Sequence, residues 1–122
     1  MHCTRAALAA LLSCCLLGAP ALAQNKAVKI GVLDDMSGPY AENTGAGDVA
    51  AAKFAIADFG GSVLGKPIEL ISADFQNKVD VGVSIAKRWW DSEDVDVILG
   101  IPNSAIVLAL VKVAEEKNRI LM

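Results

Sequence analysis

The sequence predicts an α/β fold in which helices cover both faces of a parallel β-sheet. Short runs of apolar, β-branched residues alternate along the chain with longer segments whose apolar residues recur at helical spacing. Most connections between these segments are only a few residues long and contain glycine, proline or asparagine. Such alternation is typical of βαβ units, so we expect a three-layer, Rossmann-like parallel sheet.

Each expected element has its own local signal. Strands are predicted from their β-branched and apolar composition at 28–33, 68–73, 95–99 and, barely begun, 120–122. Helices are predicted at 48–59, 79–91 and 104–117. The first helix carries Val49, Ala52, Ile56 and Phe59 at helical spacing and is expected to end at Gly60-Gly61.

Residues 1–23 are predicted to be a signal peptide that is removed on export. His2 and Arg5 give a weakly basic start, an apolar stretch covers residues 6–17, and Ala21-Leu22-Ala23 supplies the small residues that signal peptidase prefers. The apolar stretch is shorter than the roughly 20 residues that a membrane-spanning helix needs. We therefore expect an exported mature chain, residues 24–122, that begins at Gln24.

A lipoprotein signal is the less favoured alternative for the same segment. Leu11-Leu12-Ser13-Cys14 resembles a lipid-attachment box, although its second position is a poor match. All three cysteines, Cys3, Cys14 and Cys15, fall within residues 1–23. The mature chain is therefore expected to have no disulfide, no cysteine–metal site and no cysteine nucleophile.

The charged residues and the single histidine exclude further classes of function. The chain carries 11 basic and 14 acidic side chains, a formal net charge of −3, and no basic cluster that would neutralise phosphates. Nucleic-acid binding is therefore not expected. The one histidine, His2, lies in the predicted signal peptide, so the mature chain cannot form a Ser-His-Asp triad or a His-rich metal site. We expect no catalytic residues, no metal and no cofactor.

Asp34 and Asp35 follow the first predicted strand, as does the acidic pair that helps to hold Mg²⁺ in phosphorelay receiver domains. A receiver domain also needs an aspartate at the end of its third strand, whereas this strand ends in Leu99-Gly100. The sequence therefore favours a structural role, in which both carboxylates accept backbone hydrogen bonds in the loop. The acidic run 91–96 is likewise interpreted as a solvated surface bend.

Two other motifs suggest functions that their context does not favour. Residues 45–50 match the dinucleotide fingerprint GxGxxA, but residues 34–44 separate them from the strand, whereas that fingerprint requires a tight strand-to-helix turn. Trp89-Trp90 suggests carbohydrate stacking. We expect instead that one ring lies in the core and the other at its rim.

Ligands of parallel sheets bind outside the carboxyl ends of the strands, so loops 34–47, 74–78 and 100–104 are the candidate positions. In the third loop, Asn103 and Ser104 stand where a strand end meets a helix start. Either residue can simply cap the free amides of the first helical turn. The same amides, together with a hydroxyl, also suit an anion such as a carboxylate, and the spacing alone supports both interpretations equally.

Several segments occur in an order and spacing known from one family. They are Val28-Lys29-Ile30-Gly31-Val32, Asp35-Met36-Ser37-Gly38-Pro39-Tyr40, Gly60-Gly61, Leu64-Gly65-Lys66-Pro67-Ile68-Glu69 and Pro102-Asn103-Ser104. From residue 26 to residue 122 the chain resembles the N-terminal lobe of periplasmic substrate-binding proteins of branched-chain amino acid ABC transporters, the leucine-binding protein type. Residues 72–74, 76–78 and the Pro-Asn-Ser loop are most similar to members that take up aromatic carboxylates, which often carry His where this chain has Phe75.

This resemblance implies a two-lobed type I periplasmic-binding fold, of which residues 24–122 would be an incomplete N-terminal lobe. Such a protein closes in the periplasm on an amino acid or a small carboxylic acid and then docks on the permease of an ABC transporter with its ATPase subunits. A ligand-binding domain of a membrane sensory receptor and a non-functional gene fragment are the alternatives. An enzyme on the same scaffold would need catalytic groups from sequence outside this chain.

The resemblance also implies roles for individual residues. Ser104, with its neighbours Asn103 and Ala105, would hold the ligand carboxylate by hydroxyl and backbone amide. Tyr40 and the loop after it would line one wall of the site. Phe75 and Gln76, at the end of the second predicted strand, would reach the side chain or ring of the ligand.

Overall fold

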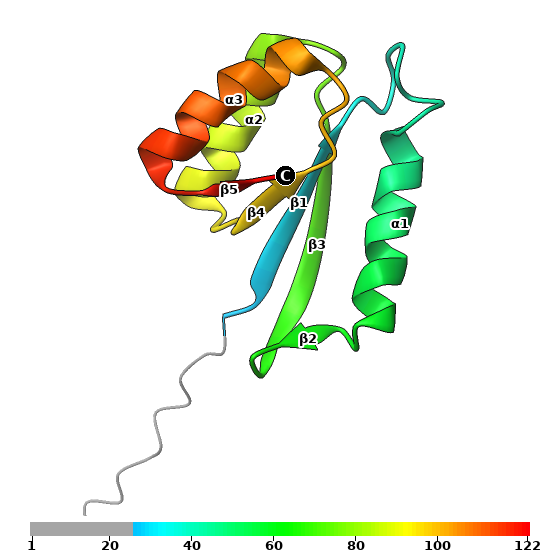
Figure 1. Ribbon diagram of the computed structural model, residues 1–122, viewed down its shortest axis with the longest axis vertical. Helices are drawn as coiled ribbons and strands as arrows, with labels where there is room; N and C mark the ends of the chain where they lie inside the picture. The colour runs from blue at the N-terminus through cyan, green and yellow to red at the C-terminus, as the bar shows by residue number, and fades with distance from the viewer. Residues whose placement is uncertain (1–25) are drawn as a thin grey trace, which may run out of the picture.

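The computed structural model describes residues 26–122 as one sheet with helices on both sides (Figure 1). The predicted signal peptide lies outside the described residues. The strands are β1 (Val28–Asp34), β2 (Ser62–Val63), β3 (Lys66–Asp74), β4 (Val97–Leu99) and β5 (Ile120–Leu121), and the helices are α1 (Gly45–Asp58), α2 (Val79–Ser92) and α3 (Ser104–Lys117). Within residues 26–122, no helix is long and apolar enough to cross a membrane.

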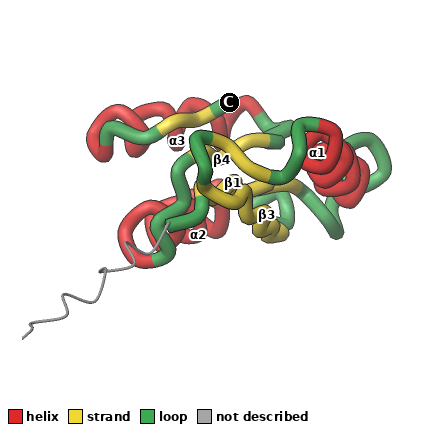
Figure 2. Tube along the Cα trace, turned by 90° about the horizontal axis from the view of Figure 1, so that it is seen from below, coloured by secondary structure: helices red, strands yellow, loops and turns green. Residues whose placement is uncertain are grey.

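The strands are arranged in the order β2-β3-β1-β4-β5. β1 is parallel to β3 along its whole length, from Val28 opposite Ile68 to Asp34 opposite Asp74, and it is also parallel to β4. β5 continues the parallel sheet beside β4. Helix α1 lies on one face of the sheet, whereas α2 and α3 pack together on the other (Figures 1 and 2). The predicted three-layer α/β architecture is confirmed.

The observed elements differ from the predicted ones mainly at their ends. The short strand β2, which was not predicted, pairs antiparallel with the start of β3 through a turn at Leu64 and Gly65, both with positive φ. Two residues carry too little periodicity to be recognised as a strand. β4 begins at Val97 because the amide of Val95 donates to the Trp89 carbonyl at 3.1 Å, and Val95 therefore belongs to the turn that follows α2.

The core lies between the sheet and the layer of α2 and α3. Trp89 and Trp90 are both buried, each with 2% of its surface exposed, so the prediction that one ring lies at the rim was wrong. Successive residues of a helix point about 100° apart. Helix α2 contacts β1 on one side and α3 on another. Both of these sides face the core, so the two neighbouring tryptophan rings can both be buried.

Helix α1 is less deeply packed than the other two helices. Val49, Ala52 and Ile56 are half-buried, and the helix contacts β1 and β3. Phe59, predicted to belong to the same apolar face, is 67% exposed, because it follows the last helical residue and caps the helix. The helical spacing therefore predicted the inner face of α1 correctly only as far as Ile56.

Gly31 is the point at which β1 meets the indole ring of Trp89. A Cβ atom at position 31 would lie 2.6 Å from Trp89 Cε3, which leaves no room for a side chain. We expect Gly31→Ala to lower the free energy of unfolding of the purified protein by about 1–3 kcal/mol, because overpacking displaces the ring or the strand. Urea denaturation provides the measurement.

Gly47→Ala is the matched control for this substitution. A Cβ atom at position 47, in α1, would meet nothing within 4 Å, and alanine favours a helix more than glycine does. The control should leave the stability unchanged or raise it. Equal destabilisation by both substitutions would show that the contact with Trp89 is not the cause.

Candidate functional site

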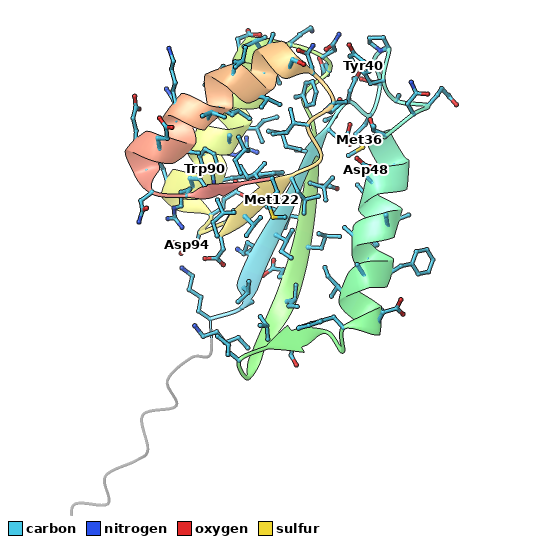
Figure 3. The ribbon with its side chains drawn as sticks, in the orientation of Figure 1. Met36, Tyr40, Asp48, Trp90, Asp94 and Met122 are labelled. Atoms are coloured by element: carbon cyan, nitrogen blue, oxygen red, sulfur yellow. The ribbon has the colours of Figure 1, made fainter. Side chains whose placement is uncertain are left out.

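The carboxyl ends of β1, β3 and β4 meet at one edge of the sheet, as parallel pairing requires. Asp34 pairs with Asp74, and Val32 pairs with Leu99. The loops that follow these strands, residues 35–44, 75–78 and 100–103, lie at this edge, which we call the carboxyl edge. Figure 3 shows Tyr40 at the same end of the molecule as the start of α1.

Asp35 shapes the first loop of the carboxyl edge. Its side chain is fully buried, with Oδ1 accepting from the Gly38 amide at 2.7 Å and Oδ2 from the Tyr40 amide at 3.0 Å. A Cβ atom at position 38 would lie 2.5 Å from both carboxylate oxygens, so the turn requires glycine. The predicted structural role of Asp35 is confirmed, and its hydrogen bonds hold the half-buried Tyr40 at the edge.

Asp34 is also fully buried, but only one of its oxygens is hydrogen-bonded. Oδ1 accepts from Thr44 Oγ1 at 2.8 Å and from the Asp35 amide at 2.6 Å. Oδ2 has no hydrogen-bond partner among the described residues and lies near Gly100 and the Asp48 carboxyl group. Burial raises the pKa of Asp34, the proximity of Asp48 raises it further, and the two hydrogen bonds to Oδ1 oppose the rise. When Asp34 is protonated, its hydroxyl supplies the donor that is missing between the two carboxyl groups.

Asp74 ties the first loop to the second. Its Oδ1 accepts from the amides of Met36 at 2.9 Å and Gln76 at 2.7 Å, and its Oδ2 accepts from Ser37 Oγ at 2.6 Å. Burial acts to raise the pKa of Asp74, but these hydrogen bonds and the charge of Lys78 outweigh it and lower the pKa below the ordinary value. Asp74 is therefore ionised at neutral pH, and its charge is taken up by these donors.

The third loop ends in Asn103, the N-cap of α3. Its Oδ1 accepts from the Ala105 amide at 2.8 Å, and its Nδ2 donates to Asn77 Oδ1 at 2.6 Å. Of the roles that the sequence left open, the structure shows capping by Asn103, and the Ala105 amide is occupied by it. Ser104 is exposed, and its amide and hydroxyl have no hydrogen-bond partner within residues 26–122. The first turn of α3 therefore presents one free amide and one free hydroxyl side by side.

The two ligand residues predicted at the end of β3 have different environments. Gln76 is exposed at the carboxyl edge, with φ 55° and its Oε1 accepting from Lys78 Nζ at 3.1 Å. Phe75 is 0% exposed and packs in the core close to Gly82 of α2. The predicted contact of Phe75 with a ligand does not fit this burial. Phe75 instead anchors the end of β3 beneath the edge.

Asn77 is a residue of this edge whose contact was not predicted. It adopts φ 52°, and its side chain joins the second loop to the third. The sequence contained one signal for a turn at this position. Asparagine tolerates the left-handed region better than most residues and is common in turns. The partner, Asn103, lies 26 residues further along the chain, and only the sheet brings the two together.

Of the acidic run 91–96, Asp91 lies at the end of α2 and only residues 93–96 form the connection to β4, so the predicted surface bend is confirmed only in part. Each carboxylate has its own partner. The pairs are Asp91 with Lys117, Glu93 with Arg88, Asp94 with Lys26, and Asp96 with the Lys29 amide. Within the described part of the chain, no group of three or more His, Cys, Asp or Glu side chains is arranged to hold a metal ion.

A family model described as periplasmic binding protein matches residues 27–122. The chain belongs to the periplasmic binding protein family. This family acts outside the cytoplasm, and the structures that the chain resembles are substrate-binding proteins rather than enzymes. A comparison with curated proteins gave no match.

Solved structures show the same family and fold. A periplasmic binding protein from Burkholderia mallei is 48% identical with a TM-score of 0.75, and the match covers 78% of this chain and 25% of that one. A branched-chain amino acid ABC transporter ligand-binding protein from Burkholderia xenovorans is 46% identical with a TM-score of 0.75, over 77% and 25% of the two chains. A solute-binding protein from Rhodopseudomonas palustris in complex with benzoate is 26% identical with a TM-score of 0.71, over 79% and 26%.

These matches confirm the predicted resemblance and the type I periplasmic-binding fold. The chain spans only about a quarter of the length of each of these structures.

Replacing the buried Asp34 and Asp35 by asparagine should change the free energy of unfolding in opposite directions. Asp34→Asn keeps an acceptor for Thr44 and adds an Nδ2 donor toward Asp48, so the free energy of unfolding at pH 7 should rise by about 1 kcal/mol. Because the pKa of Asp34 is raised in the folded state, its contribution to stability is full at low pH and is lost as the pH rises through that pKa. The advantage of the variant should therefore grow between pH 4 and pH 7 in urea denaturation.

Asp35→Asn is the control at the neighbouring, equally buried position. Both oxygens of Asp35 already accept backbone amides, and an asparagine can accept only one of them. This variant should lose about 1–3 kcal/mol of stability. If both substitutions destabilise the protein to the same extent, the lack of a donor for Asp34 Oδ2 does not limit the stability of the protein.

Proposed function

We propose that this chain provides part of the ligand site of a periplasmic solute receptor for ABC-type uptake of amino acids or small carboxylates, including aromatic ones. The observation that carries this proposal is the free amide and hydroxyl of Ser104 at the start of a 14-residue helix. They lie at the carboxyl edge, where ligands of parallel sheets bind.

The electrostatics of α3 suit one carboxylate oxygen at this position. The N-terminus of a helix carries a partial positive charge that stabilises an anion by about 0.3–1 kcal/mol, and up to about 2 kcal/mol when the site is shielded from water. Asp35 and Asp74 lie at the same edge, and their oxygens already accept hydrogen bonds from the loops. In the proposed site, Ser104 donates to the ligand carboxylate and Asn103 supports it by capping the helix.

Tyr40 and Gln76 complete the part of the proposed site that this chain supplies. Tyr40 stands on the first loop, where its ring can line a wall beside the ligand. Gln76 is exposed on the second loop and can reach the remainder of the ligand. Phe75 and the Ala105 amide are left out of the proposal, because one is buried and the other is occupied.

The class of ligand follows from the relatives and from the site together. One relative is a branched-chain amino acid transport protein and another holds benzoate, and both ligands carry a carboxylate. Because the chain spans about a quarter of these relatives, the remaining contacts would come from an opposite lobe that closes over the ligand. We further propose that residues 1–23 direct export and that the closed receptor docks on an ABC permease.

Calorimetric titration of the complete two-lobed receptor that contains this lobe, with leucine, benzoate and 4-hydroxybenzoate, tests the proposal. Ser104→Ala should weaken whichever acid binds by about 1–3 kcal/mol, because one carboxylate oxygen loses its hydroxyl donor. Ser92→Ala is the matched control, since Ser92 is an exposed serine at the far end of α2. The proposal fails if none of the three acids binds the complete receptor, or if its Ser104→Ala and Ser92→Ala variants bind them equally well.

A further inference from the structure

One side-chain hydrogen bond joins the second and third loops of the carboxyl edge. Asn103 Nδ2 donates to Asn77 Oδ1 at 2.6 Å, while Asn103 Oδ1 accepts from the Ala105 amide at 2.8 Å. A carboxamide whose donor and acceptor are both engaged has a single favourable orientation. The position of Asn77 therefore decides how Asn103 caps α3.

We propose that Asn77 is a positioning residue for ligand recognition. By holding Asn103 in the cap, it keeps the Ala105 amide occupied and leaves the Ser104 amide and hydroxyl as the donors for the ligand carboxylate. Asn77 acts through Asn103 and does not itself contact the ligand. This inference rests on the proposed function, since it concerns the same site.

The backbone around Asn77 is held firmly enough for this role. Its φ of 52° follows a φ of 55° at Gln76, and the Gln76 amide is bonded to Asp74 Oδ1 at 2.7 Å. The Lys78 amide donates to the Phe75 carbonyl at 2.9 Å, and the Phe75 side chain is fully buried. The loop is thus anchored in the core on one side and at the end of β3 on the other. Asn77 Oδ1 consequently has a defined place relative to α3.

Without Asn77, the cap loses the contact that orients it. The Asn103 amide can then rotate away from the helix, and the Ala105 amide becomes a second free donor beside Ser104. The second and third loops also lose their side-chain link. A ligand would have to order both groups on binding, which lowers its affinity even though every ligand contact is chemically present.

Asn77→Gly removes the side chain and keeps a residue that adopts positive φ easily. With whichever of leucine, benzoate or 4-hydroxybenzoate binds the wild type, calorimetry should show an affinity lowered about five- to tenfold, as expected for one lost hydrogen bond. Asn118→Gly is the matched control, because Asn118 has φ 50° and lies at the opposite end of α3. Its affinity should stay within about twofold of the wild type, the range of substitutions away from a site.

A double-mutant cycle with Asn103→Ser separates positioning from a general loss of stability. Serine retains an oxygen that caps Ala105 but cannot also donate to Asn77. Asn103→Ser alone should weaken binding as much as Asn77→Gly, and the double variant should bind no more weakly than either. The Asn103→Ser variant therefore tests the link even if Asn77→Gly does not fold. Unchanged affinity in the single variants, or losses that multiply in the double variant, would overturn the inference.

The outcomes for Ser104 and Asn77 can be told apart. If Ser104→Ala binds like the wild type, the proposed site itself is wrong. If Ser104→Ala weakens binding but Asn77→Gly and Asn103→Ser do not, the site is right and the positioning role of Asn77 is wrong.

Discussion

The parallel pairing of β1 with both β3 and β4 is the constraint on which the other features depend. It aligns the carboxyl ends of three strands, so that loops distant in the sequence share one edge. It also brings Asp34 opposite Asp74, which places two carboxylates within reach of the loop that follows β1. The close approach of Gly31 to Trp89 keeps this central strand near α2. A shift of the register by one residue would reverse the faces of β1 and separate these groups.

The carboxyl edge contains several carboxylates beside a site proposed for an anion, and its hydrogen bonds explain how both can coexist. Asp35 and Asp74 accept hydrogen bonds from amides and a hydroxyl of the loops, so their charge maintains the backbone. Burial raises the pKa of Asp34 above its ordinary value. The positive end of α3 lies at the same edge, where it favours an anion. In the proposed site, acidic residues thus build the edge, while the neutral donors of Ser104 recognise the ligand.

The described surface is an open half of the proposed site. The surface grooves between α1 and β4 and near the end of α3 contain none of the predicted ligand residues. Tyr40 and Gln76 instead stand on loops at an exposed edge, and Ser104 begins α3 at the same edge. A ligand at such an edge is shielded from water only when something covers it, and its hydrogen bonds are weak until then. In the proposed receptor, closure of a second lobe supplies that cover, which explains why recognition depends on loop positioning.

The sequence by itself determined the alternation of strands and helices, because this depends on local periodicity, and it indicated the family through a resemblance in the order and spacing of several segments. Asn103 and Ser104 were both candidates to cap α3, and their spacing alone did not distinguish a cap from an anion site. The burial of Trp90 and Phe75, the orphaned oxygen of Asp34 and the bond from Asn77 to Asn103 were decided by the tertiary structure alone. Each depends on which element packs against which, and so on contacts between residues far apart in the chain. Local spacing carries no information about such contacts, because the same helix or strand end can be exposed or buried according to its neighbours.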